Sequence, residues 1–97
     1  MSADDINLVA PISLPEGATI TKVIVYGNAG AESQTWEFKR VQFSNGGSAA
    51  LASAAVNTED TSIAVTLVQN YYYAYFLSIE GLDTSDQIYG ARITYTL

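Results

Sequence analysis

Short runs of alternating apolar and polar residues, separated by turn-forming residues, predict an all-β chain. In residues 61–68, Ile63, Val65 and Leu67 alternate with small or polar side chains, which is the pattern of a half-buried strand. Further strands are predicted over residues 6–14, 19–26, 34–43, 71–80 and 88–97. Turn-forming residues such as Gly, Asn, Asp and Pro lie between these runs, at the spacing expected of two packed sheets.

Residues 49–56 are the ambiguous segment, because their many alanines favour a helix. The run is barely two helical turns long and directly follows Asn45-Gly46, a pair that supplies the two positive φ angles of a tight hairpin turn. We therefore predict a strand over residues 49–56 and a hairpin before it.

Three local features refine these elements. Pro11 lacks a backbone donor and is tolerated at a sheet edge or at a bend between sheets, and we expect the first strand to switch sheets there. The run Leu14-Pro15-Glu16-Gly17 fits a type I turn. In residues 34–43 the apolar positions change from even to odd numbers across Lys39-Arg40, and a bulge in that strand would keep them on one face.

Together these elements predict a single domain, residues 1–97, with seven to eight strands. With so few helical signals, the economical arrangement is two packed antiparallel sheets with Greek-key connections. We predict an antiparallel β-sandwich, jelly-roll-like.

Composition and charge mainly exclude functions. The net charge is −6, so neither nucleic acid nor an anionic membrane surface is expected as a partner. The chain has no cysteine and no histidine, which removes disulfides, thiolate nucleophiles, His-based triads and zinc sites built from these residues. We expect no enzymatic activity and no cofactor.

Acidic residues gather in two predicted loops: Asn57, Glu59 and Asp60 in one, Asp83 and Asp86 in the other. Loop carboxylates can hold Ca²⁺, but neither loop has the spacing of a calcium-binding motif. Acidic loop residues are usually solvated turn formers, so we predict no metal site.

Only 14% of the residues are charged, while 48% are apolar, so apolar surface is expected to face a partner. The strand over residues 71–80 carries Tyr72 and Phe76 on its second face, and Ile88 follows nearby. Arg92, on the adjoining outer face, is expected to stack on one of these rings or to pair with Glu80. We predict a homo-oligomer, specifically a trimer, formed through this face.

A glycan is the alternative partner. Aromatic rings with a hydroxyl offer an apolar face and a polar edge, and four of the seven tyrosines lie between Tyr71 and Tyr75. In this interpretation Tyr72 forms the platform for a sugar, as does Trp36 if its side chain is exposed.

Three stretches carry a resemblance: the run from Ala10 to Thr21, the strand from Tyr71 to Leu77 and the ending Ile88-Tyr89-Gly90-Ala91-Arg92-Ile93-Thr94-Tyr95-Thr96. They resemble small β-sandwich domains of unknown function from predicted secreted bacterial proteins. In those domains a Leu-Pro-Asp-Gly-Ala turn opens the domain and a Gly-Val-Arg-Ile-Thr-Tyr strand closes it. Here Glu16 replaces the Asp, and Ala91 replaces the Val.

The resemblance implies a fold and an extracellular or secreted setting, and no active-site residue carries over from it. The first residues, Met1-Ser2-Ala3-Asp4-Asp5, have no signal-peptide pattern, and no run is long enough for a transmembrane helix. We therefore expect a soluble structural or interaction module, part of an extracellular or virion assembly.

Overall fold

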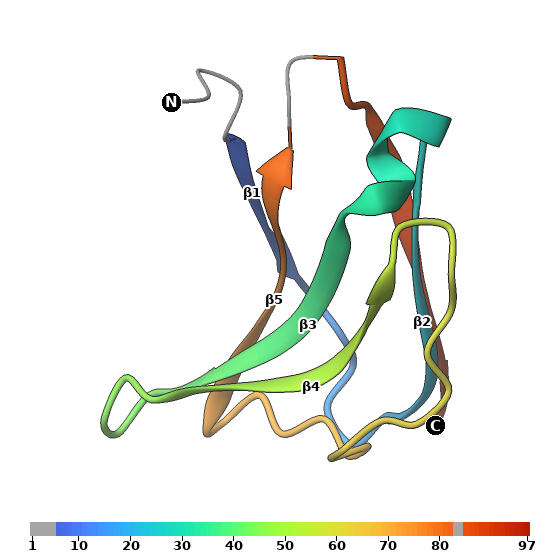
Figure 1. Cartoon of the computed structure of the whole chain (residues 1–97). Helices are drawn as coiled ribbons and strands as arrows, with labels where there is room; N and C mark the ends of the chain where they lie inside the picture. Colours follow the sequence, from blue (N-terminus) through green and yellow to red (C-terminus); the bar gives the residue numbers. More distant parts are fainter. Residues whose placement is uncertain (1–5, 83–84) are drawn as a thin grey trace.

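The computed structural model describes residues 6–82 and 85–97, and it is all-β, as predicted (Figure 1). The strands are β1 (Ile6–Ile12), β2 (Thr19–Gly27), β3 (Thr35–Gln42), β4 (Ser48–Ala55), β5 (Tyr73–Leu82) and β6 (Ile88–Thr96), with one 3₁₀ helix, η1 (Ala29–Ser33). They form a four-stranded antiparallel sheet in the order β1-β5-β3-β4 and a two-stranded antiparallel sheet, β2-β6. The sheets do not close into a barrel, and both the β-sandwich and its jelly-roll order stay predictions.

The inward faces of both sheets share one hydrophobic core. Alternation along β3 and β5 turns Trp36, Phe38, Tyr75, Leu77 and Ile79 inward, against the inward side chains of β2. The Phe38 and Tyr75 rings stack with their centroids 5.9 Å apart. The Tyr75 hydroxyl accepts a hydrogen bond from the Gln69 backbone N–H at 2.8 Å, so this ring fills the core without leaving its polar atom unsatisfied.

Asn57 joins the two sheets where the chain leaves β4. It adopts a left-handed conformation, with φ 69°, which asparagine tolerates better than most residues. Its N–H donates to Val25 O at 2.7 Å, and its side-chain amide exchanges hydrogen bonds with the backbone of Gly27 at 2.9 and 3.0 Å. The same amide donates to Glu32 at 2.7 Å, so one residue holds the exit of β4, the end of β2 and η1.

Trp36 reinforces this turn from inside the core. Its side chain is fully buried, and its indole N–H donates to the carbonyls of Ala55 and Thr58, each at 3.1 Å. A buried indole donor without a partner would cost free energy. The two carbonyls at this turn therefore satisfy the indole donor, and the same hydrogen bonds hold the turn in place.

The predicted strand over residues 61–68 is not a regular strand. Its pairing with β2 is limited to the isolated bridges Thr19–Leu67 and Val23–Asp60. Ala64 N–H instead donates to Leu51 O in β4 at 2.8 Å, and Thr66 O accepts from Ile20 N–H in β2 at 2.8 Å. Because the segment crosses from one sheet to the other, its burial does not alternate: Val65 and Leu67 are exposed and Val68 is buried.

The predicted bulge exists, but the extra residue is in β4. Phe38 pairs with Ala52 and Lys39 pairs with Ala50, so Leu51 is the unpaired residue, while β3 pairs with β5 without interruption. Leu51 and Ala52 are consecutive and both buried, which a bulge permits. Phe43 therefore does not turn inward, as the sequence pattern suggested, but is exposed beyond the end of β3.

Both predicted turns form with different geometry. Ala18 N–H donates to Pro15 O at 3.2 Å and Gly17 has φ 80°, so the turn covers residues 15–18 and has the positive third-position φ of type II. In the β3–β4 hairpin only Gly46 has a positive φ, and the connection is longer than a two-residue turn. The predicted switch between sheets at Pro11 is wrong, because β1 stays in one sheet as its edge strand, a position where a proline is tolerated.

Asn57 gives a direct test of the junction. We expect Asn57→Ala to lower the free energy of unfolding by about 3 kcal/mol, because it removes the side-chain hydrogen bonds and strains the backbone. Asn57→Gly keeps the positive φ and should cost about 1 kcal/mol less than Asn57→Ala. Urea denaturation of both variants measures this, and a glycine variant no more stable than the alanine variant would contradict the backbone argument.

Candidate functional site

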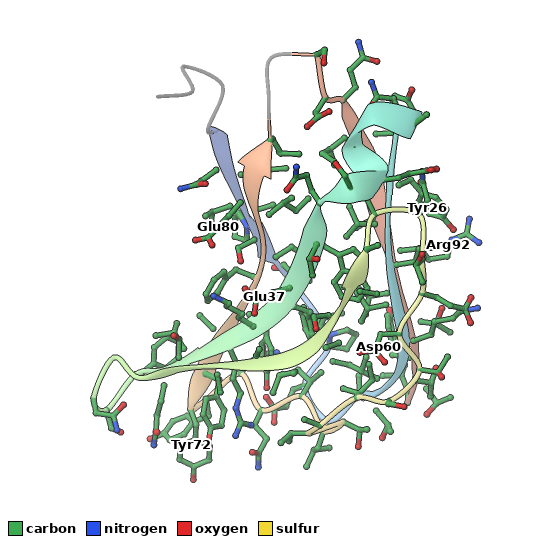
Figure 2. The ribbon with its side chains drawn as sticks, in the orientation of Figure 1. Tyr26, Glu37, Asp60, Tyr72, Glu80 and Arg92 are labelled. Atoms are coloured by element: carbon green, nitrogen blue, oxygen red, sulfur yellow. The ribbon has the colours of Figure 1, made fainter. Side chains whose placement is uncertain are left out.

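The residues predicted as an interface do not form one patch (Figure 2). Tyr72 is exposed in the turn before β5, and Phe76 is half-buried on the outer face of the four-stranded sheet. Ile88 lies at the start of β6 beside the core, and Arg92 is exposed on the outer face of the two-stranded sheet. Trp36 is in the core and presents no ring to a ligand.

Arg92 also does not lie beside the residues predicted as its partners. Glu80 lies in β5 and Arg92 in β6, on different sheets, and Figure 2 shows them far apart in that view. Lys22 pairs with Glu59 and Lys39 pairs with Glu37, and neither of these ion pairs includes Arg92. The cation that stacks on a tyrosine is Arg40, whose guanidinium lies 3.8 Å from the centre of the Tyr73 ring.

The acidic loop residues that the structure describes have structural partners. The Asp60 carboxylate accepts hydrogen bonds from Ser62 N–H at 2.7 Å and from Ser53 N–H, in β4, at 3.1 Å. Glu59 pairs with Lys22 at 3.8 Å. Asp86 is half-buried, and Asp83 lies outside the described residues. Over residues 6–82 and 85–97, no three acidic residues gather in a metal-binding cluster.

At two sides of the molecule an edge of one sheet lies opposite an edge of the other, and only one of these sides is covered by a chain segment among the described residues. On one side, residues 57–68 connect the edge of β4 to the edge of β2 through the contacts of Asp60, Ala64 and Thr66. On the other side, β1 is the edge of one sheet and β6 is the edge of the other. Between them lies an apolar groove of about 350 Å³, lined by Leu8, Ala10, Ile12, Val25, Leu77, Ile79 and residues 88–91. We call β1, β6 and this groove the open side.

The hydrogen bonds of β2 show which backbone groups of β6 face outward. Val23 exchanges hydrogen bonds with Asp60 at 2.9 and 3.1 Å, so its N–H and C=O point away from β6. In an antiparallel pair, opposed residues either bond to each other or both point away. Ile93, which pairs with Val23, therefore turns its backbone groups to the free edge.

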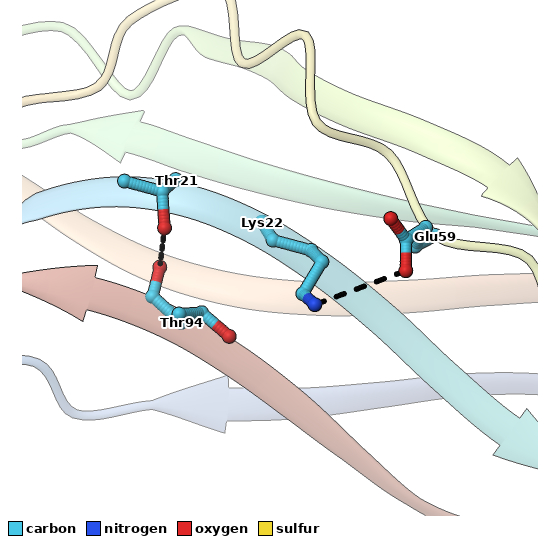
Figure 3. Close-up of polar contacts among 4 residues, drawn as sticks. All are labelled: Thr21, Lys22, Glu59 and Thr94. Carbon is cyan, nitrogen blue, oxygen red and sulfur yellow. Dashed lines mark hydrogen bonds and ion pairs between the residues drawn. The ribbon is translucent and has the colours of Figure 1, made fainter.

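The neighbouring residues of β6 follow the same alternation. Ile20 donates to Thr66 O at 2.8 Å, so Tyr95, its partner in the ladder, also faces the free edge. Thr94, between them, faces β2, and its carbonyl accepts a hydrogen bond from the Thr21 hydroxyl at 3.1 Å (Figure 3). Among the described residues no strand lies along this edge of β6.

The open side carries little charge. β1 contains no charged residue, and β6 contains only Arg92, although the whole chain has a net charge of −6. Large apolar side chains are exposed along both strands, namely Leu8, Val9, Tyr89 and Tyr95, and Leu97 follows them. Native proteins usually protect free edges with charges, prolines or covering segments. Among the residues of β1 and β6, the protective prolines and charges are limited to Pro11 in β1 and Arg92 in β6.

A second exposed feature was only partly predicted. Phe43 and Tyr71 lie with Tyr72 around a pocket of about 310 Å³, which Gln42 and Ser44 also line. We call these residues the aromatic corner. The sequence singled out Tyr72 and missed Phe43 and Tyr71, because the alternating pattern assigned both to inward positions; their place beside the turn signals at Asn45 and Asn70 was the available hint.

Comparisons with known proteins add no relative: no protein-family model, no curated protein and no solved structure matches this chain. None of the helices in the described part of the chain has the length and apolar character needed to cross a membrane.

Asp60 and its neighbour Glu59 test how the closed side is held. We expect Asp60→Ala to lower the free energy of unfolding by about 2 kcal/mol, because two backbone donors lose a charged acceptor. Glu59→Ala removes only an exposed ion pair and should cost less than about 0.5 kcal/mol. Equal effects in thermal or urea denaturation would show that the Asp60 contacts do not hold residues 57–68 in place.

Proposed function

We propose that this chain is a non-catalytic structural module, a jelly-roll-like β-sandwich that self-associates into a homo-oligomer through its open side. The observation that supports this most is the free edge of β6, nine residues long, beside an apolar groove. A long, nearly uncharged edge strand readily pairs with another strand. Such pairing gives affinity through the backbone and specificity through alternate side chains.

The occupant that fits best is a second copy of this chain. Each copy offers two free edges, β1 and β6, and neither carries a carboxylate among its residues. At a net charge of −6, acidic surfaces of two copies repel each other, so these edges are where they can approach. The exposed Leu8, Tyr89 and Tyr95 side chains would then be removed from water.

The proposed trimer requires that neighbouring copies pair through different edges. Pairing of β6 with β6 of another copy is self-complementary and stops at a dimer, whereas pairing of β6 with β1 of the next copy is head-to-tail. A head-to-tail contact that turns by a third of a circle closes at three copies and leaves neither edge free. We propose an extracellular or virion structure as the setting of this assembly, and the sequence resemblance supports the extracellular one.

Two substitutions at Tyr95 separate backbone pairing from side-chain packing. Tyr95→Ala removes the exposed ring but keeps the outward N–H, so a trimer should persist with roughly tenfold weaker association, which is about 1.4 kcal/mol. Tyr95→Pro also removes the N–H, which points away from β2, so the ladder within the domain should survive. Analytical ultracentrifugation should show the proline variant as a monomer.

The wild-type protein is the reference for these measurements. A wild-type mass of one chain at micromolar concentration would overturn self-association. A mass of two chains would replace the head-to-tail ring with a self-complementary pair. Circular dichroism of Tyr95→Pro must match the wild type for its mass to count, and a trimeric, folded proline variant would rule out pairing through this edge.

A further inference from the structure

The aromatic corner is a second exposed surface, independent of the open side. Tyr71, Tyr72 and Phe43 are 83%, 55% and 61% exposed, and none of them lines the apolar groove between β1 and β6. Self-association through the open side therefore leaves these rings unexplained.

The backbone that carries these rings is held by hydrogen bonds. Phe43 N–H donates to Tyr72 O at 3.0 Å, which ties the start of the hairpin to the tyrosine turn. The Asn70 side chain donates to Leu14 O at 2.7 Å, and its backbone N–H donates to Glu16 at 2.6 Å. A site whose parts are already fixed loses less conformational entropy when it binds a ligand.

The geometry of the rings suits a flat ligand with an apolar face. Tyr71 and Tyr72 are perpendicular, with an interplanar angle of 89° and centroids 5.0 Å apart. They form two walls of a pocket of about 310 Å³, at the lower end of the range for small-ligand sites. A ligand ring that packs on the face of one tyrosine would contact the edge of the other tyrosine ring.

The polar groups of the corner are uncharged at neutral pH. Besides the aromatic residues, Gln42 and Ser44 line the pocket, and no acidic or basic residue is among those that line it. A site of this kind has no counter-charge for a phosphate, a carboxylate or a cation. It offers hydrogen-bond donors and acceptors to hydroxyl groups.

A second, more polar pocket adjoins the corner. It has a volume of about 230 Å³ and shares Gln42 with the first pocket, while Arg40, Asn45 and Tyr73 line its other walls. The Arg40 guanidinium is stacked on the Tyr73 ring, which orders this wall. Two adjoining pockets that share one amide match a ligand built from linked rings rather than a single small molecule.

From these features we infer that the aromatic corner binds an oligosaccharide, with one uncharged sugar ring against Tyr71 and Tyr72 and the next ring toward Asn45. A sugar ring has an apolar face that packs on an aromatic side chain and hydroxyl groups around its edge. Proline-rich peptides also dock on exposed tyrosines, but their repeat of about 9 Å needs a series of aromatic ridges. Only the first of the two pockets has exposed aromatic walls.

The test is an NMR titration of the full chain with four neutral hexasaccharides: cellohexaose, xylohexaose, mannohexaose and chitohexaose. At least one should bind at submillimolar to millimolar concentration and shift the amides of Phe43, Ser44 and Tyr72. Tyr71→Ala and Tyr72→Ala should each weaken that binding tenfold or more, whereas Tyr26→Ala, which removes a tyrosine on the outer face of β2, should leave it unchanged.

Three results would overturn the inference. The first is no shift with any of the four sugars at millimolar concentration. The second is shifts outside the corner that survive both corner substitutions. The third is binding of a decaproline peptide at the corner with no sugar response, which would assign the site to a peptide. Because the corner shares no residue with the open side, none of these results depends on the oligomeric state.

Discussion

The segment that follows β4 bonds to the edges of β4 and β2, and it cannot also cover the opposite edges, β1 and β6. Which backbone and apolar groups are exposed depends on this constraint. Residues 57–68 leave β4 at Asn57, reach across to β2 and bond to both edges. In a chain of 97 residues, no further segment among those described lies over the opposite side. The domain is thus closed along β4 and β2 and open along β1 and β6.

The closed side is held by hydrogen bonds, whereas the groove on the open side is lined mainly by apolar side chains. Asn57, Asp60 and the indole of Trp36 hydrogen-bond to backbone groups of β2, β4 and the turn that follows β4. On the open side the groove lies over buried core residues such as Leu77 and Ile79, and the exposed Leu8 and Tyr89 side chains line it as well. Covering this groove would bury more apolar surface without rearranging the fold.

The sequence predicted most of the strands because their apolar and polar residues alternate. The prediction failed where the chain crosses from one sheet to the other. β4 was recognised despite its alanines, since the hairpin signal at Asn45-Gly46 preceded it. Residues 61–68 alternate like a strand, yet bonding to two different edges changes which side chains are buried, and no local pattern encodes that. The bulge was assigned to β3 because Val41 and Phe43 suggested it, although Leu51 in β4 provides the extra residue.

The residues predicted to share one patch do not lie together, for a related reason. Tyr72, Phe76, Ile88 and Arg92 were grouped by their distance along the chain, but which sheet a strand joins decides its neighbours. The exposed edge of β6 depends on strand order, which alternation does not determine. Likewise, Trp36 was a candidate for exposure, because a sequence does not reveal that the Ala55 and Thr58 carbonyls would accept its indole donor.

Amide hydrogen exchange along β6 tests the central claim, that a second copy covers the free edge in the native protein. The amides of Ile93 and Tyr95 point away from β2, while those of Arg92 and Thr94 face it. If the edge is paired in the assembly, Ile93 and Tyr95 should exchange as slowly as Arg92 and Thr94. Exchange of Ile93 and Tyr95 at the rate of an unstructured chain, with Arg92 and Thr94 protected, would contradict the account.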